Sequence, residues 1–292
     1  MTRRSWLSAG LLAVALGSIG QAAQGPTLSN VLARAGSYAL QYQRDLPAVI
    51  AVEEYAASGG SPLVFGAGQP PVAGSSTPPL VTFRLRSARS HAFRSDYVLL
   101  SDDSDGWLVF RDVFEIDRQV VRTREDRLTG AFQQSRDAGI ARATAIARAS
   151  EPFKLGAPGM LDVPMLPLLF VRPENVSHVD FSLGAMKLID GIRAVELRFR
   201  ELGRPTIVEA EEGYLSCSGA LWVDPETGRV LRTLLHAKGM LTSADVDVTY
   251  DADRSLGVRV PSEMKAHYEK AGAATTTRAR YSAFRRFRVG PN

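Results

Sequence analysis

Two apolar runs flank a turn sequence at residues 221–232, where the chain reads LWVDPETGRVLR. Pro225 presets φ for the first corner of a tight turn, and Gly228 supplies a positive φ that other residues disfavour. The flanking apolar runs contain Val and Trp, which favour strands. The stretch therefore predicts a β-hairpin.

Further strand-like runs extend this hairpin in both directions along the chain. Several alternate between apolar and polar residues, most clearly at 195–199 and 246–250, which predicts strands with one buried face. Turn signals such as Asp190-Gly191 join them. The predicted strands cover residues 80–85, 97–100, 107–116, 176–183, 186–189, 192–199, 206–209, 215–223, 229–237, 244–250, 259–268 and 275–289. Such short joints predict a long antiparallel meander.

Two segments show helical patterns instead. From Thr27, a predicted N-cap, apolar residues recur every three or four positions, and Pro47 ends this helix near Asp45, with a strand starting after it. A second helix, rich in Ala and Arg, is predicted over 130–150. Residues 58–79 are rich in Gly and Pro and predict a flexible loop. No linker separates two cores, so we expect one α+β domain over residues 23–292.

The chain opens with a pattern typical of a secretory signal peptide, predicted over residues 1–22. Arg3 and Arg4 precede an apolar stretch at 6–19, and small residues lie before a cleavage site after Ala22. This stretch of about 14 residues is too short to span a ~30 Å hydrocarbon core. The paired arginines leave a twin-arginine export route open. We expect a periplasmic or secreted protein with no transmembrane segment in the mature chain and, without a cysteine near the cleavage site, no lipid anchor.

The charge and cysteine content exclude several classes of function. The formal net charge is +4, or +2 without Arg3 and Arg4, and acidic residues are interleaved with basic ones, so a nucleic-acid partner is not expected. Cys217 is the only cysteine, which rules out an intramolecular disulfide. We expect it to be a small buried residue.

No motif predicts catalysis or a metal site. The four histidines are far apart in sequence, and there is no nucleophile elbow or phosphate-binding glycine loop. The neighbours Glu53 and Glu54 cannot converge on one substrate from a helix or a strand, and are expected to be surface charges. We therefore predict no catalytic residue, metal or cofactor. A hydrolase with dispersed catalytic groups remains an alternative.

The apolar segment at residues 163–171, VPMLPLLFV, has two interpretations. It is either a short buried element under the sheet, which we favour, or a segment that lines or covers an apolar pocket.

The hairpin at 221–232, the export leader, the N-terminal helix and the long meander together resemble the LolA/LolB-like superfamily of periplasmic lipoprotein carriers and lipid-binding proteins. The stretch 279–287, ARYSAFRRF, is also similar to the closing strands of uncharacterised secreted bacterial proteins. The resemblance implies a large curved antiparallel sheet, a half-barrel closed by helices, that holds acyl chains on its concave face.

The resulting prediction is a non-enzymatic binding protein for a hydrophobic or amphipathic ligand, a lipid or the acyl chain of an acylated protein. A structural or interaction module of the cell envelope is the first alternative. An open apolar cavity would favour the carrier, and a filled core would favour the module. Alternation along the strands predicts the ligand-lining residues Trp107, Leu108, Phe110, Leu168, Phe170, Leu197, Phe199, Leu221 and Trp222.

Overall fold

The computed structural model describes residues 25–60, 64–65, 83–84, 89–102, 106–150, 161–210 and 213–291. The leader at 1–22 and most of the loop at 58–79 lie outside these ranges. The helices are α1 (Leu28–Asp45), α2 (Arg127–Ala131), α3 (Arg136–Ser150) and the 3-10 turns η2 (Leu166–Val171) and η3 (Val176–His178). The strands are β1 (Ala48–Gly60), β2 (Val64–Phe65), β3 (Phe83–Arg84), β4 (Arg89–Asp102), β5 (Gly106–Ile116), β6 (Gln119–Val120), β7 (Val179–Ile189), β8 (Ile192–Glu201), β9 (Val208–Ala210), β10 (Gly213–Val223), β11 (Val230–Lys238), β12 (Thr242–Asp253), β13 (Val258–Lys270) and β14 (Ala273–Arg286).

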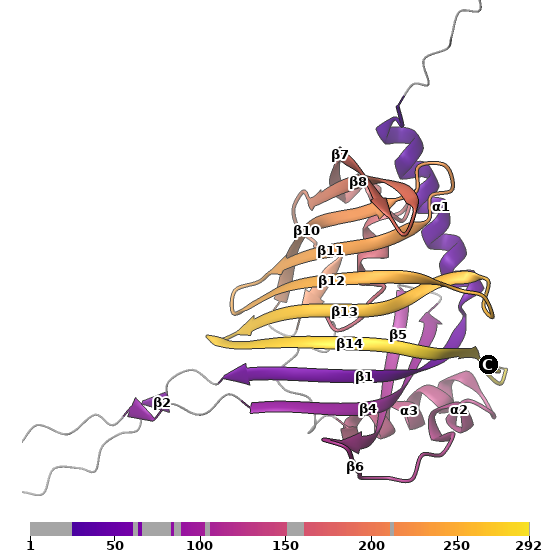
Figure 1. The fold of residues 1–292 in the computed structure, drawn as a ribbon, viewed down its shortest axis with the longest axis vertical. Helices are drawn as coiled ribbons and strands as arrows, with labels where there is room; N and C mark the ends of the chain where they lie inside the picture. Colours follow the sequence, from indigo (N-terminus) through magenta and orange to yellow (C-terminus); the bar gives the residue numbers. More distant parts are fainter. Residues whose placement is uncertain are drawn as a thin grey trace, which may run out of the picture.

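Twelve of these strands form one antiparallel sheet in the order β6-β5-β4-β1-β14-β13-β12-β11-β10-β8-β7, with β9 paired to β10. Figure 1 shows that strand direction changes strongly across the sheet, as expected of a twisted and curved sheet of this size. The last strand, β14, lies between β13 and β1, so the C-terminal meander joins the N-terminal strands without a break. The predicted α+β class with a large curved antiparallel sheet is confirmed.

Alternation along the strands separates an inner from an outer face. On β8, Val195, Leu197 and Phe199 are buried, while Arg198 between them is exposed. On β12, Val246, Val248 and Tyr250 are buried in the same way. Both alternating patterns predicted from the sequence are therefore confirmed. We call the face covered by α1 and η2 the inner face.

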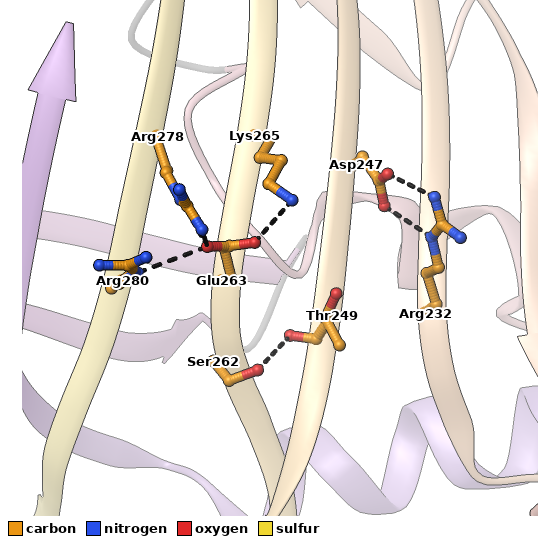
Figure 2. Close-up of polar contacts among 8 residues, drawn as sticks. All are labelled: Arg232, Asp247, Thr249, Ser262, Glu263, Lys265, Arg278 and Arg280. Atoms are coloured by element: carbon orange, nitrogen blue, oxygen red, sulfur yellow. Dashed lines mark hydrogen bonds and ion pairs between the residues drawn. The ribbon is translucent and has the colours of Figure 1, made fainter. Parts of the chain in front are cut away.

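The outer face of the C-terminal strands carries ion pairs (Figure 2). Arg232 donates two hydrogen bonds to Asp247, at 2.8 and 2.5 Å, across β11 and β12. Glu263 on β13 accepts from Lys265 at 2.8 Å and from Arg278 on β14 at 2.6 Å. Arg232 and Arg278 pair with a carboxylate on a neighbouring strand, and Lys265 pairs with one on its own strand, which suits a wet sheet face.

The two predicted helical regions are found, with one difference. α1 begins after Thr27, whose hydroxyl accepts from the Asn30 N–H, and it ends at Asp45 before Pro47. The predicted helix at 130–150 is instead two helices, α2 and α3, separated around Phe132. Gly139 of α3 lies so close to Phe132 that a Cβ there would be 2.3 Å from its ring. Residues 176–178, predicted as strand, form η3.

The core is divided between the two faces of the sheet. The main cluster lies on the inner face. There α1 and η2 pack on the strands that run from β5 to β8 in the order of the sheet, that is, through β1, β14 and β11. A second cluster packs α2 and α3 against the opposite face of β1, β4 and β5. Within the residues that the structure describes, the inner face is thus filled by protein side chains. Within the same residues, no helix is long and apolar enough to cross a membrane.

Candidate ligand-binding site

The hairpin turn at residues 224–228 holds the N-terminal half of α1. Gly228 has φ +76°, and a Cβ at this position would lie 2.3 Å from the Arg34 carbonyl oxygen. Arg34 in turn donates a hydrogen bond to the Pro225 carbonyl. Gly36 allows a close approach of α1 to η2 as well, because a Cβ there would be 2.7 Å from the Val171 carbonyl oxygen. The predicted turn therefore also determines where α1 lies.

The other end of α1 is held by the last strand. Arg286 of β14 donates to the Asp45 carbonyl from Nε at 3.2 Å and from Nη2 at 3.1 Å. A cationic donor at these unpaired carbonyls also interacts favourably with the helix dipole. The 224–228 turn thus holds the N-terminal half of α1, and β14 holds its C-terminal end.

Two cavities lie beside α1 and meet at Arg34. The first, which we call the α1 groove, has a volume of about 390 Å³. It is lined by Ala33, Arg34, Ser37, Tyr38, Gln41, Tyr42 and Asp45 of α1 and by Thr227, Arg229, Gly257, Val258 and Arg259. The second, the N-terminal hollow, has a volume of about 740 Å³. It is lined by Gly25, Pro26, Thr27, Asn30, Arg34, Met186, Gly191, Ile192, Arg193, Asp224, Pro225 and Glu226. Both volumes fall in the range of small-molecule sites.

The two cavities combine apolar and basic surfaces. Three guanidinium groups and one carboxylate, that of Asp45, line the α1 groove. Met186 and Ile192, on the β7–β8 hairpin, supply an apolar part of the N-terminal hollow. This arrangement suits a ligand with a charged end and an apolar end.

The nine residues predicted to line a ligand cavity are distributed over both faces of the sheet. Six belong to the inner-face core: Trp107, Leu168, Phe170, Leu197, Phe199 and Leu221. Phe110 and Leu108 belong to the core beneath α2 and α3, and Trp222 belongs to a small outer cluster. The rings of Phe170 and Phe199 stack with centroids 4.5 Å apart. None of the nine lines the α1 groove or the N-terminal hollow. Their contact with a ligand stays a prediction.

The segment at 163–171 is a buried element under the sheet, as the favoured interpretation predicted. Leu168, Phe170 and Val171 are at most 1% exposed. The Tyr250 hydroxyl donates to the Pro164 carbonyl at 2.5 Å, which ties the segment to β12.

A buried ion cluster, unforeseen in the sequence, anchors the start of this segment to the inner face. Arg111 donates to both carboxylate oxygens of Glu53, at 2.6 and 2.9 Å, and its Nη2 lies 3.0 Å from an Asp162 carboxylate oxygen. Ser95 donates to Glu53 at 2.9 Å. The prediction that Glu53 is a surface charge is therefore wrong, because Glu53 follows the buried alternation of β1 and its side chain is enclosed. The local sequence carries no such signal, because residues 48–52 are apolar throughout and do not indicate which of Glu53 and Glu54 faces inward.

Cys217 is buried, as predicted. Its backbone N–H donates to the Glu201 carboxylate at 2.6 Å. Burial, and secondarily the nearby Glu201, raises the pKa of the Cys217 thiol well above its usual range. A thiol in this environment is a poor nucleophile. Among the described residues, no three His, Cys, Asp or Glu side chains are grouped as a metal site.

No protein-family model matches the chain, and no curated protein matches it by sequence. Solved structures match it over most of its length. One is a domain described as an outer membrane lipoprotein-sorting protein from Vibrio parahaemolyticus, at 10% identity, with 89% of this chain and 93% of that chain covered and a TM-score of 0.39. Another is a DUF1329 family protein from Desulfovibrio piger, at 10% identity, 87% and 92% coverage and a TM-score of 0.33.

A third match is a LolA superfamily protein from Nitrosomonas europaea, at 11% identity, 90% and 94% coverage and a TM-score of 0.29. The matches thus include the superfamily that the 221–232 hairpin resembles.

Proposed function

We propose that this chain is a non-enzymatic binding protein of the cell envelope that holds an amphipathic molecule, a lipid or a lipoprotein acyl chain, along α1. The observation that carries the proposal is the pair of adjoining cavities, one lined by three arginines and the other partly by Met186 and Ile192. The export leader predicted from residues 1–22 supports the envelope location.

The apolar end of the ligand supplies most of the binding free energy in this proposal. Each buried methylene contributes about 0.8 kcal/mol, so about ten buried methylenes correspond to the ~8 kcal/mol of micromolar binding. The inner face, with Leu168 and Phe170 packed on it, is filled, so the ligand binds beside α1 rather than beneath it.

The proposal is tested by native mass spectrometry of protein purified from its own source, followed by organic extraction. In parallel, the melting temperature is measured with laurate, dodecyl phosphate and dodecyltrimethylammonium below their micellar concentrations. A co-purifying amphiphile and a raised melting temperature with at least one twelve-carbon probe are expected. Absence of both results would overturn the proposal.

A matched pair of variants locates the apolar end. Met186 lines the N-terminal hollow, whereas Leu188, two residues along the same strand, does not line it and is 71% exposed. Met186→Glu is expected to weaken binding of all three probes, and Leu188→Glu to leave it unchanged. Both side chains are exposed, so neither change should affect folding.

A second candidate function is that of an interaction module. It is favoured by the filled inner face and by exposed apolar side chains after β8, at the start of β10 and in the β11–β12 turn. These side chains are Leu202, Tyr214, Met240 and Leu241. Met240, in the β11–β12 turn, is 89% exposed. If Met240→Ser abolished a cross-link to another envelope protein while all twelve-carbon probes failed to bind, the module would replace the carrier.

A further inference from the structure

The α1 groove holds more positive than negative charge. Its lining includes Arg34, Arg229 and Arg259 against the single carboxylate of Asp45. Asp190, outside the lining, lies 3.0 Å from the Arg259 guanidinium and compensates part of its charge. The groove therefore favours an anion over a cation.

The three arginines differ in how many of their guanidinium N–H groups already donate to other residues of the protein. Arg34 donates to the Pro225 carbonyl. Arg259 donates to the Tyr250 carbonyl from Nε at 2.8 Å and from Nη2 at 2.5 Å, and its side chain is only 10% exposed. The exposed Arg229 side chain, by contrast, forms no hydrogen bond or ion pair with any other residue in the described ranges. A free guanidinium fork matches the two oxygens of a carboxylate or phosphate.

Tyr38 supplies an independent observation. Its hydroxyl oxygen is buried and has no hydrogen-bond partner within the described part of the chain. Tyr38 lines the groove together with Arg229 and Arg259, and burial raises the pKa of Tyr38, so its hydroxyl stays protonated. An unpaired buried hydroxyl costs about 1–3 kcal/mol, which an accepting ligand oxygen would remove.

We propose that the α1 groove recognises the anionic head group, a carboxylate or phosphate, of the amphiphile. Arg229 binds two of its oxygens, the Tyr38 hydroxyl donates to it, and Arg259 is a fixed positive charge behind them. Val258 and the Tyr38 ring belong to the apolar part of the same lining, where the first methylenes of the tail pack. This inference rests on the proposed function and adds the chemical class of the ligand.

Three single variants test the head-group site by calorimetric titration with laurate, dodecyl phosphate and dodecyltrimethylammonium. Arg229→Gln is expected to weaken binding of the two anions by ~10- to 100-fold and to leave binding of the cation unchanged or stronger, because a positive charge is removed from the groove. Tyr38→Phe is expected to weaken the anions by up to ~10-fold. Asp45→Asn is expected to strengthen the anions and weaken the cation.

Arg254→Gln is the control for a general charge effect. Arg254 is an exposed arginine of the β12–β13 turn that does not line the groove. Its loss should change anion binding less than twofold. Arg229 is exposed as well, so loss of folding is not expected to obscure the result, and circular dichroism checks this directly.

The outcomes separate the head-group site from the proposed function. If all three twelve-carbon probes bind equally and Arg229→Gln has no effect, head-group recognition is wrong while amphiphile binding stands. If inorganic phosphate binds as tightly as dodecyl phosphate and is lost in Arg229→Gln, the anion site stands but the tail contributes nothing, which overturns the proposed function. If none of the probes binds, both proposals fail.

Discussion

Replacing Gly228 by alanine should weaken the packing of α1 against the turn at 224–228. Gly257 provides a matched control. Both glycines line or adjoin the α1 groove in hairpin turns, with φ of +76° and +72°. A Cβ at Gly257 would meet nothing within 4 Å, whereas a Cβ at Gly228 would be 2.3 Å from the Arg34 carbonyl oxygen. The two changes therefore share the backbone strain and differ in the contact with α1.

The magnitudes follow from these two terms. A left-handed conformation costs an alanine about 1–2 kcal/mol, and forcing extra volume into a packed contact costs about 1–3 kcal/mol more. Gly257→Ala should thus lower the free energy of unfolding by about 1–2 kcal/mol, and Gly228→Ala by about 2–5 kcal/mol. Urea unfolding followed by circular dichroism measures both. Equal losses in the two variants would refute the claim that the turn supports α1 through this contact.

Three further predictions concern buried or paired groups. Glu53→Gln should lower the free energy of unfolding by about 3 kcal/mol, because it leaves Arg111 short of a buried partner; a loss below about 1 kcal/mol in urea unfolding would contradict this. Cys217 should react with iodoacetamide only in denaturant, and rapid labelling of the folded protein, seen by mass spectrometry, would show that the thiol is accessible. Burial raises the pKa of Glu263, but Lys265 and Arg278 outweigh it and the pKa is lowered overall. Its stabilisation should therefore be present at pH 7 and be lost in acid as the pH falls through the lowered pKa, so Glu263→Gln should cost about 1 kcal/mol at pH 7 and progressively less at lower pH, measured by urea unfolding over a pH series.

Local patterns predicted most of the strands and both helical regions because each depends on neighbouring residues, although residues 58–60, predicted as loop, belong to β1 and residues 89–96 of β4 were not predicted as strand. The alternation at 195–199, the turn at 224–228 and the end of α1 before Pro47 were all found as predicted. The pairing of β1 with β14 could not be predicted in this way, because no turn joins strands so far apart in sequence. Only the completed sheet brings them together.

The candidate site was harder to predict than the fold because it depends on contacts between distant segments. Arg34 belongs to α1, Arg229 lies just before β11 and Arg259 lies at the start of β13, and nothing in their local sequence marks them as neighbours. The predicted lining residues were chosen by alternation, which identifies a buried face and cannot tell a filled face from an open one. Trp222 was assigned to the wrong face. It follows the inward-facing Leu221 directly in the strand and therefore lies on the opposite face.

The turn at 224–228 links the fold to the site. A glycine at 228 allows the turn to touch the α1 backbone, and the hydrogen bond from Arg34 to Pro225 holds that contact. Because α1 already meets the turn at Gly228 and η2 at Gly36, it cannot move closer to the sheet, and the space between these contacts remains as the α1 groove. A larger residue at 228 would push α1 outward and separate Tyr38 from Arg229 and Arg259. The residues that form the hairpin thus also set the width of the groove in which we place the anionic head group.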